Sequence, residues 1–357
     1  MKYLINRSDA IGDNILTTPM AQAIFELDPE AEIGIITSYL CRDLYHEHPY
    51  ISRVFHFDKK DSYWHKIKKS LVIFKEFDPD FYFYVGGSQT PNFVAWLKSV
   101  PFRGGILSRW TTFLVLNKGI RQKRSQVAQH EIFYNVDLLK HLSGFEKVDD
   151  KEYLPVMIVP KKIDARKEFN EEIKSAGLNE SLPFIVIHPG MTGHTLNWPS
   201  RNYGRLIRRL NLLYPNKYNY IISHTPSDNT YLLGTRDEID AEENLSKNVY
   251  FFDGSKKGLL NYMNVIKEAK LFIGPSTGTT HIAASLEVPV VSIFSPIKAQ
   301  SALRWGPKGK GQIFTVTPNV VCGETLKCAG QTCPYYECMS KIEVDDLLVH
   351  IKKILEN

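Results

Sequence analysis

The sequence has no long hydrophobic run. None of its 357 residues falls in a stretch of about 18 to 20 uninterrupted apolar residues, the length that a membrane-spanning helix requires. The opening residues, MKYLIN, are too short to form a secretory signal. These two absences predict a cytoplasmic protein that does not cross a membrane.

Cysteine is scarce and unevenly placed. Cys41 stands alone, whereas Cys322, Cys328, Cys333 and Cys338 follow one another with the spacing C-x5-C-x4-C-x4-C. Structural zinc sites prefer cysteine pairs separated by two to four residues, so this spacing fits such a site only loosely. Disulfides are rare in the cytoplasm. We therefore expect reduced, partly buried thiols, with a zinc site as the alternative.

Two motifs of cofactor and metal binding are missing or incomplete. A dinucleotide-binding loop needs the pattern G-x-G-x-x-G, but the turn after the first predicted strand contains only Gly12, which argues against a dehydrogenase. Asp78-Pro79-Asp80 resembles a D-x-D metal motif, but its proline and its position before a strand favour a surface turn. We expect neither a cofactor nor a metal in the site.

Acidic residues are absent between Phe81 and His130. The net charge of +5 is modest for this length and does not by itself favour nucleic acid. The acid-free segment nevertheless contains seven basic residues, Lys98, Arg103, Arg109, Lys118, Arg121, Lys123 and Arg124. One explanation is a solvated basic face. The other is a surface that binds an anionic partner, such as a phosphorylated lipid or an acidic sugar.

Strand and helix patterns alternate through both halves of the chain. Short apolar runs predict strands at residues 2–5, 33–37, 54–57, 81–85, 184–187, 220–223, 248–252, 271–273 and 290–294. Helical patterns between them are clearest at 66–77, 130–142, 202–213, 259–269 and 344–355. This order predicts an α/β protein with two Rossmann-like, doubly wound domains. We expect the first at 1–150, a linker and domain entry at 151–180, the second at 181–340 and a C-terminal helix at 341–357.

The most informative stretch is Leu271 to Pro296. It contains a strand, a turn at Gly274-Pro275, a run of small hydroxylated residues, a helix and a second strand, the order of a βαβ unit. The helix of such a unit begins with unpaired backbone N–H groups and the positive end of its dipole, so a phosphate or diphosphate is the expected ligand. The common alternative is a helix start rich in Ser and Thr that binds nothing.

The pattern S-T-G-x-x-H-I-A-A in this stretch resembles the donor-binding signature of glycosyltransferase family 9, the heptosyltransferases of the lipopolysaccharide inner core. His188-Pro189-Gly190 with Trp198-Pro199, the N-terminal Gly12-Asp13 and the C-terminal Cys338-Met339 resemble further signatures of this family. The resemblance implies the GT-B architecture, in which two Rossmann-like domains face each other across a cleft. It also implies an inverting, metal-independent transfer of a sugar, with ADP-heptose as the expected donor.

The resemblance also assigns roles to individual residues. Asp13 is the candidate base that deprotonates the acceptor hydroxyl; Asp9 is the competing carboxylate, and capping of a helix is the other role open to Asp13. The basic segment of the first domain, rather than the resemblance, supplies the candidate acceptor-binding residues Arg103, Arg109 and Arg121, and Gly12 beside Asp13 is the fourth. The candidate donor-binding residues are His188, Gly190, Thr192, Ser276, Thr277, Gly278, Thr279 and His281.

Two positions depart from the family pattern. Leu196 replaces the lysine that ordinarily precedes x-W-P, and Ser276 replaces the acidic residue that opens D-[ST]-G. A lost cation weakens diphosphate binding unless another group substitutes, and Arg201, Lys256 and Lys257 are the candidates.

Two alternatives therefore stay open beside transfer of heptose to a lipopolysaccharide-core or related glycan acceptor. One is a GT-B enzyme that uses another nucleotide sugar, such as a UDP- or GDP-linked hexose. The other is a nucleotide-sugar-binding protein that has lost turnover. An anionic glycolipid acceptor would bring the protein into peripheral contact with the cytoplasmic face of the inner membrane, and no nucleic-acid partner is expected.

Overall fold

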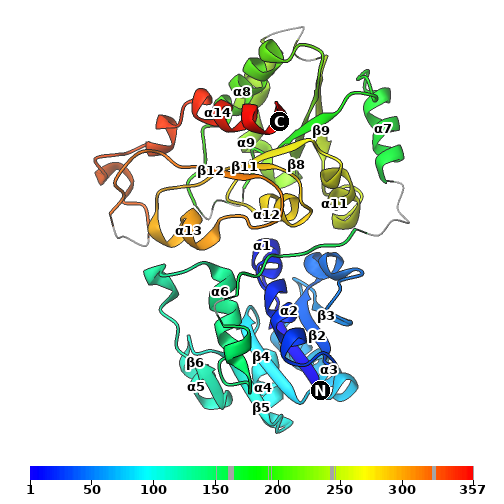
Figure 1. Cartoon of the computed structure of the whole chain (residues 1–357), viewed down its shortest axis with the longest axis vertical. Coiled ribbons are helices and arrows are strands. Elements are labelled where there is room, and N and C mark those ends of the chain that lie inside the picture. The colour runs from blue at the N-terminus through cyan, green and yellow to red at the C-terminus, as the bar shows by residue number, and fades with distance from the viewer. Residues whose placement is uncertain are drawn as a thin grey trace. The chain divides into compact units, whose positions relative to one another are not determined.

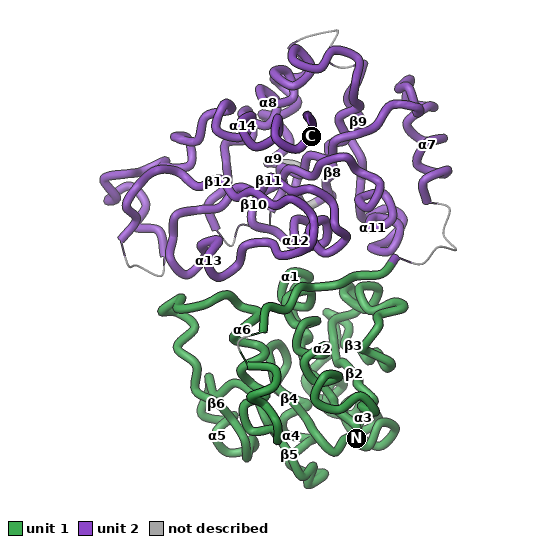
Figure 2. Tube along the Cα trace, in the orientation of Figure 1, with its two compact units in different colours: residues 1–158 green, residues 159–357 purple. Residues whose placement is uncertain are grey.

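The chain folds into two compact units in this computed structural model, Met1–Ile158 (unit 1) and Val159–Asn357 (unit 2), which Figure 2 colours separately. The structure describes residues 1–149, 151–159, 165–191, 193, 195–241, 245, 247–323 and 327–356. Each unit contains one six-stranded parallel sheet with helices packed on it. No described helix combines the length and the apolar character needed to cross a bilayer.

Unit 1 is built on a sheet with the strand order β3-β2-β1-β4-β5-β6. Its strands are β1 Lys2–Arg7, β2 Glu32–Ser38, β3 Arg53–Phe57, β4 Phe81–Gly86, β5 Phe102–Ile106 and β6 Lys118–Ile120. Its helices are α1 Ile11–Ile15, α2 Thr18–Leu27, α3 Tyr63–Phe77, α4 Thr90–Leu97, α5 Trp110–Val115 and α6 Glu131–Val136. Helices α3, α4 and α5 pack side by side as one layer, and α2 packs against α6 (Figure 1).

Unit 2 has a sheet with the order β12-β11-β10-β7-β8-β9. Its strands are β7 Phe184–Ile187, β8 Asn219–His224, β9 Val249–Asp253, β10 Leu271–Pro275, β11 Val290–Ile293 and β12 Ile313–Val316. Its helices are α7 Ala165–Ser175, α8 Ser200–Leu213, α9 Asn229–Asp240, α11 Leu259–Lys267, α12 Gly278–Ser285, α13 Ala302–Trp305 and α14 Val344–Leu355.

The central strands of both sheets are apolar because helices cover them on both faces. In β1 every residue after Lys2 is buried, and in β7 all four residues are buried. The parallel register pairs Ile5 with Ile35 on one side and with Phe83 on the other. Such pairing brings the carboxyl ends of the strands to one edge of the sheet, and the loops that follow the strands meet there.

The two sheets share one topology. In unit 1, β2 lies on one side of β1 and β4 lies on the other side. In unit 2, β8 and β10 flank β7 in the same way. The strand order therefore reverses between β1 and β4, and again between β7 and β10. Ligands of open α/β sheets bind at such switch points, beyond the carboxyl ends of the strands. The predicted α/β fold of two doubly wound units is confirmed.

The C-terminal segment completes the core of unit 2. Helix α14 packs against β11, β12 and α8, and its Leu347, Leu348 and Ile351 are buried in the core of this unit. Trp198 is buried as well, and its indole Nε1–H donates a hydrogen bond to the carbonyl oxygen of Ile342 at 2.9 Å. The loop after β7 is thereby tied to the entry of α14.

Candidate functional site

Arg7 lies at the switch point of unit 1, as the last residue of β1. Its side chain is only 4% exposed, and it donates hydrogen bonds in three directions. Nε donates to Asp9 Oδ1 at 3.0 Å, Nη1 to the carbonyl oxygen of Val85 at 3.1 Å, and Nη2 to Asp13 Oδ1. One buried guanidinium therefore positions both carboxylates that the sequence singled out.

A second ion pair lies behind Arg7. Glu131, the first residue of α6, is buried and accepts a hydrogen bond from Arg124 Nη1, while its Oε1 is 3.9 Å from Arg7 Nη1. Two guanidinium groups thus face three carboxylates; we call Arg7, Asp9, Asp13, Arg124 and Glu131 the Arg7 cluster. Buried charges persist only when they are paired in this way.

The Arg7 cluster changes the protonation of its members. Burial raises the pKa of Asp9 to about 6; Arg7 opposes this rise and the nearby Asp13 adds to it. Burial alone would lower the pKa of Arg7, but the charges of Asp13, Asp9 and Glu131 outweigh it and raise that pKa. Arg7 therefore stays charged at every relevant pH.

Asp13 lies in the first turn of α1, beside Gly12. The N-cap of this helix is Ala10, so Asp13 does not cap it. Instead the carboxylate accepts its hydrogen bond from Arg7. The capping role that the sequence left open for Asp13 is therefore excluded by its position.

The glycines after β4 allow the Asp9 loop to approach. A Cβ atom on Gly86 would lie 2.8 Å from Asp9 Oδ2. Gly87 has φ of +83°, a conformation that favours glycine, and a Cβ there would lie 2.5 Å from Ser8 Oγ. Ser8 Oγ also accepts a hydrogen bond from the backbone N–H of Ser88 at 2.8 Å. The loops after β1 and β4 thus pack directly against each other.

The basic acceptor candidates are dispersed. Arg109 follows β5 and Arg121 follows β6, so both lie toward the same edge of the sheet as Arg7, and both are exposed. Arg103 lies near the start of β5 and donates hydrogen bonds to the carbonyl oxygens of Val115 at 2.8 Å and Val100 at 2.5 Å. The structure therefore does not bring Arg103 to the Arg7 cluster.

His188 occupies the switch point of unit 2, directly after β7. Its Nδ1 is 3.0 Å from Ser223 Oγ, which in turn is 3.1 Å from Tyr262 Oη. Burial lowers the pKa of His188 to about 4, although the charge of Asp228 opposes the change. The imidazole is therefore neutral at pH 7, and it offers hydrogen bonds rather than positive charge.

Asp228 lies against the loop that follows His188. A Cβ atom on Gly190 would be 2.4 Å from Asp228 Cγ, so only glycine fits there. Asp228 Oδ2 accepts hydrogen bonds at 2.8 Å from both the backbone N–H and the hydroxyl of Thr225. On the other side of the loop, Asn197 Nδ2 donates to the carbonyl oxygen of Pro189 at 2.8 Å. The loop is therefore held from both sides.

Helix α12 begins immediately after β10. Its N-cap Thr277 is extended and makes no side-chain capping bond, so the first-turn N–H groups, including those of Gly278 and Thr279, have no helical acceptor. Ser276 and His281 are both buried next to this turn. β10 pairs with β7, which brings residues 276–281 beside His188. Seven of the eight donor candidates therefore lie at one switch point, and Thr192 lies outside the described residues.

Two of the three candidate cations of unit 2, Lys257 and Arg201, interact with carboxylates elsewhere. Lys257 Nζ is 3.1 Å from Glu168 and 3.7 Å from Glu172, both on α7. Arg201 is 4.0 Å from Asp237, with both side chains exposed. Leu196, at the position where the family has lysine, packs against the core of unit 2.

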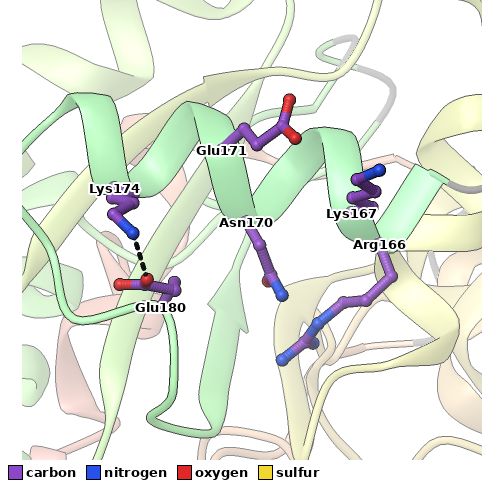
Figure 3. Close-up of a pocket in the computed structure, with 6 residues that line it drawn as sticks. All are labelled: Arg166, Lys167, Asn170, Glu171, Lys174 and Glu180. Atoms are coloured by element: carbon purple, nitrogen blue, oxygen red, sulfur yellow. Dashed lines mark ion pairs between the residues drawn. The ribbon is translucent and has the colours of Figure 1, made fainter.

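Two surface hollows lie away from these residues. One has a volume of about 290 Å³ and is lined by polar and charged residues of α7 and by Glu180, which pairs with Lys174 of α7 at 2.9 Å (Figure 3). The other, of about 360 Å³, lies between α8 and the start of α14. Neither contains a predicted site residue. All five cysteines carry free thiols, and the described residues include no group of three or more His, Cys, Asp or Glu side chains placed to hold a metal ion.

Several residues at the two switch points were not predicted from the sequence, namely Arg7, Glu131, Ser223, Asp228 and Tyr262. Arg124 was expected on a basic surface, but it is buried and donates a hydrogen bond to Glu131. Arg7 had a usable signal, because a cation at the end of an apolar strand and just before a glycine turn lies where ligands bind. The others come from distant segments, and only the folded chain brings them to the site.

A sequence relative and two structural neighbours of this chain are proteins of the same kind. Residues 91–329 match the family model described as "Glycosyltransferase family 9 (heptosyltransferase)", a range that begins after Gly12-Asp13. A Haemophilus influenzae protein provisionally named a glycosyltransferase is 24% identical over 312 residues, 86% of each chain.

Two solved structures share the fold over the whole chain. E. coli ADP-heptose lipopolysaccharide heptosyltransferase II has a TM-score of 0.78 and 16% identity, covering 100% of this chain and 99% of that one. The family 9 glycosyltransferase of Veillonella parvula has a TM-score of 0.77 and 17% identity, covering 100% and 97%. At these identities the likeness shows the fold.

Proposed function

The chain belongs to glycosyltransferase family 9, and from this premise we propose that it transfers heptose from ADP-heptose to an anionic lipopolysaccharide-core or related glycan acceptor. It is a glycosyltransferase with the GT-B architecture. The donor proposal is supported by the E. coli neighbour, which is named for ADP-heptose. No cofactor is needed, because the nucleotide sugar is itself the activated substrate.

The donor side of the proposal lies at the switch point of unit 2. The free N–H groups at the start of α12 would bind the diphosphate, and their dipole would stabilise the negative charge that develops as it leaves. His188 is neutral, and Lys257 and Arg201 pair with carboxylates. The helix terminus would therefore supply much of the stabilisation, in a metal-independent reaction.

The acceptor side lies at the switch point of unit 1. Asp13 would accept the proton of the acceptor hydroxyl, and the oxygen would attack the anomeric carbon from the face opposite the nucleotide. The bond to the diphosphate breaks as the new glycosidic bond forms, so a single displacement inverts the configuration. Arg7 would hold the Asp13 carboxylate in place before the reaction.

The observation that carries this proposal is the Arg7–Asp13 pair at the carboxyl end of β1. The test is turnover of a panel of nucleotide sugars by the parent protein and by Asp13→Asn. We expect kcat to fall by about 10²-fold or more while donor KM stays similar, because the variant keeps the shape but not the basicity. Asp80→Asn, an exposed carboxylate before β4, is the matched control. Equal turnover by Asp13→Asn and the parent protein would remove Asp13 as the base.

Leu196 favours a second candidate, a nucleotide-sugar-binding protein without turnover, because its packing on the core leaves no cation at that position. Calorimetry with ADP, UDP and GDP separates the nucleotide classes, and an enzyme that uses a UDP- or GDP-linked sugar would bind those nucleotides instead. Heat of binding without any product would identify a binding protein. A lipid-linked acceptor would also require peripheral contact with a membrane.

A further inference from the structure

Two short helices of unit 1 carry large apolar side chains on their outer faces. On each helix these residues have the spacing i, i+3, i+4, which places them on one face. They are 41% to 75% exposed and comprise Phe93, Trp96 and Leu97 of α4 and Trp110, Phe113 and Leu114 of α5. Because α4 packs beside α5 (Figure 1), we call these six residues the α4–α5 face.

This arrangement reverses the usual amphipathic pattern. Apolar residues at i, i+3 and i+4 normally face the core. Here the core-facing positions hold smaller side chains, such as Val94 and Ala95 of α4 and Thr112 of α5, which are fully buried. The six large residues therefore leave much of their apolar surface uncovered by unit 1. Apolar residues gathered on one surface mark an interaction site more often than chance exposure.

Positive charge borders the α4–α5 face. Lys98 follows α4, Arg109 is the N-cap of α5 and Lys118 opens β6 after it, and all three are exposed. The sequence has no acidic residue between Phe81 and His130. Tryptophan and phenylalanine insert at the level of lipid headgroups, while long basic side chains reach the phosphates.

We propose that the α4–α5 face docks the protein on an anionic phospholipid bilayer. Basic residues beside the apolar surface complement anionic headgroups. The same residues disfavour a second copy of the chain as the occupant, since a two-fold interface through this face would bring like charges together. The proposal rests on the membrane contact of the proposed function, but vesicle binding needs neither donor nor acceptor.

The test is co-sedimentation of the full chain with vesicles of phosphatidylcholine alone, or of equal parts phosphatidylcholine and phosphatidylglycerol. We expect binding to the anionic vesicles that weakens as salt is added. The double variant Trp96→Ser/Trp110→Ser should lower the partition coefficient at least about tenfold. Its matched control is Leu212→Ser/Leu233→Ser, which replaces two equally exposed apolar residues of unit 2 and should bind as the parent does.

Charge is tested separately with Lys98→Glu/Lys118→Glu, which should abolish the preference for anionic vesicles. Lys267→Glu/Lys270→Glu, two exposed lysines of unit 2, is its control. The proposal is overturned if the parent does not bind anionic vesicles, or if the variants of the α4–α5 face bind as well as their controls. It is also overturned if sedimentation velocity shows a dimer that the tryptophan variant dissolves. Turnover of the tryptophan variant on a soluble acceptor should match the parent, so a failure of vesicle binding is distinct from a failure of sugar transfer.

Discussion

Replacing Asp9 by asparagine should stabilise unit 1 at neutral pH. Asparagine keeps the shape of the side chain and can still accept the hydrogen bond from Arg7 Nε, but it carries no charge. Burial raises the pKa of Asp9 to about 6 in the folded protein, whereas an unfolded aspartate titrates near pH ~3.9. The folded state therefore holds the Asp9 proton more tightly than the unfolded state does.

The size and sign of the effect follow from these two pKa values. Between about pH 4 and pH 6 the unfolded chain has released this proton while the folded chain still holds it. The free energy of unfolding of the parent protein therefore falls as the pH rises through this range, and above pH ~6 it falls no further. Each pH unit between the two pKa values corresponds to about 1.4 kcal/mol, which sets a ceiling of about 3 kcal/mol. Because the Asp9 side chain is 32% exposed, solvent screening reduces the expected gain to about 1–2 kcal/mol.

Urea denaturation at pH 7.5 and pH 4 measures this difference. The three tryptophans of unit 1 are exposed whereas Trp198 of unit 2 is buried, so amide hydrogen exchange in β1 and β4 is the probe that follows unit 1 itself. Asp9→Asn should raise the free energy of unfolding at pH 7.5 and leave it unchanged at pH 4. Two outcomes would refute this prediction: an equal change in the free energy of unfolding at pH 7.5 and pH 4, or a decrease of that free energy at pH 7.5.

Asp61→Asn in the same unit should behave in the opposite way. Burial tends to raise the pKa of Asp61, but hydrogen bonds from Lys69 and from the backbone N–H of Asp58 outweigh it and lower that pKa. Its ionised form therefore stabilises the folded state above the unfolded pKa, so the asparagine should destabilise unit 1 at pH 7.5 and have less effect at pH 4.

Three further substitutions test the structure by denaturation. Gly190→Ala places a Cβ atom against a carboxylate and should cost about 1–3 kcal/mol, whereas Gly323→Ala, where the Cβ meets no atom of the described residues within 4 Å, should cost little. Arg7→Met removes the cation that bonds to the partly buried Asp9 and Asp13, so it should cost about 1–3 kcal/mol at pH 7.5 and less at pH 4. Arg103→Met loses hydrogen bonds to backbone only and should show no such pH dependence. Trp198→Phe leaves a buried carbonyl unpaired and should cost about 1–3 kcal/mol. Equal losses within either matched pair, or no loss for Trp198→Phe, would contradict these assignments.

The sequence predicted the central strands well, because continuous apolar runs are the mark of strands buried on both faces. The predicted strand 184–187 and helix 344–355 match β7 and α14 residue for residue. The misses have physical reasons: β6 is three residues long, and α7 is so polar that only three of its residues are buried. The predicted helix 130–142 ends at Val136, and a 3-10 turn follows it.

The candidate site was predicted unevenly. Residues within one motif, such as Ser276 to His281, could be grouped from the sequence because a βαβ turn is local. The contacts that adjust the site are not local: Arg7 meets Glu131 across the sheet, and Gly190 meets a carboxylate 38 positions later. Side-chain packing makes these pairings, and no spacing in a single sequence reveals them.

The bond between Trp198 and Ile342 bears on the order of events during synthesis. Unit 1 is a continuous N-terminal segment, so it can fold while the ribosome is still translating the remainder. Unit 2 lacks part of its interior until residues 342–354 have left the exit tunnel, because Ile342, Ile351 and Ile354 belong to that interior. In a nascent chain, unit 1 would therefore be folded while unit 2 is still incomplete. Premature termination within α14 would leave the core of unit 2 incomplete, and cellular proteases would degrade such a product.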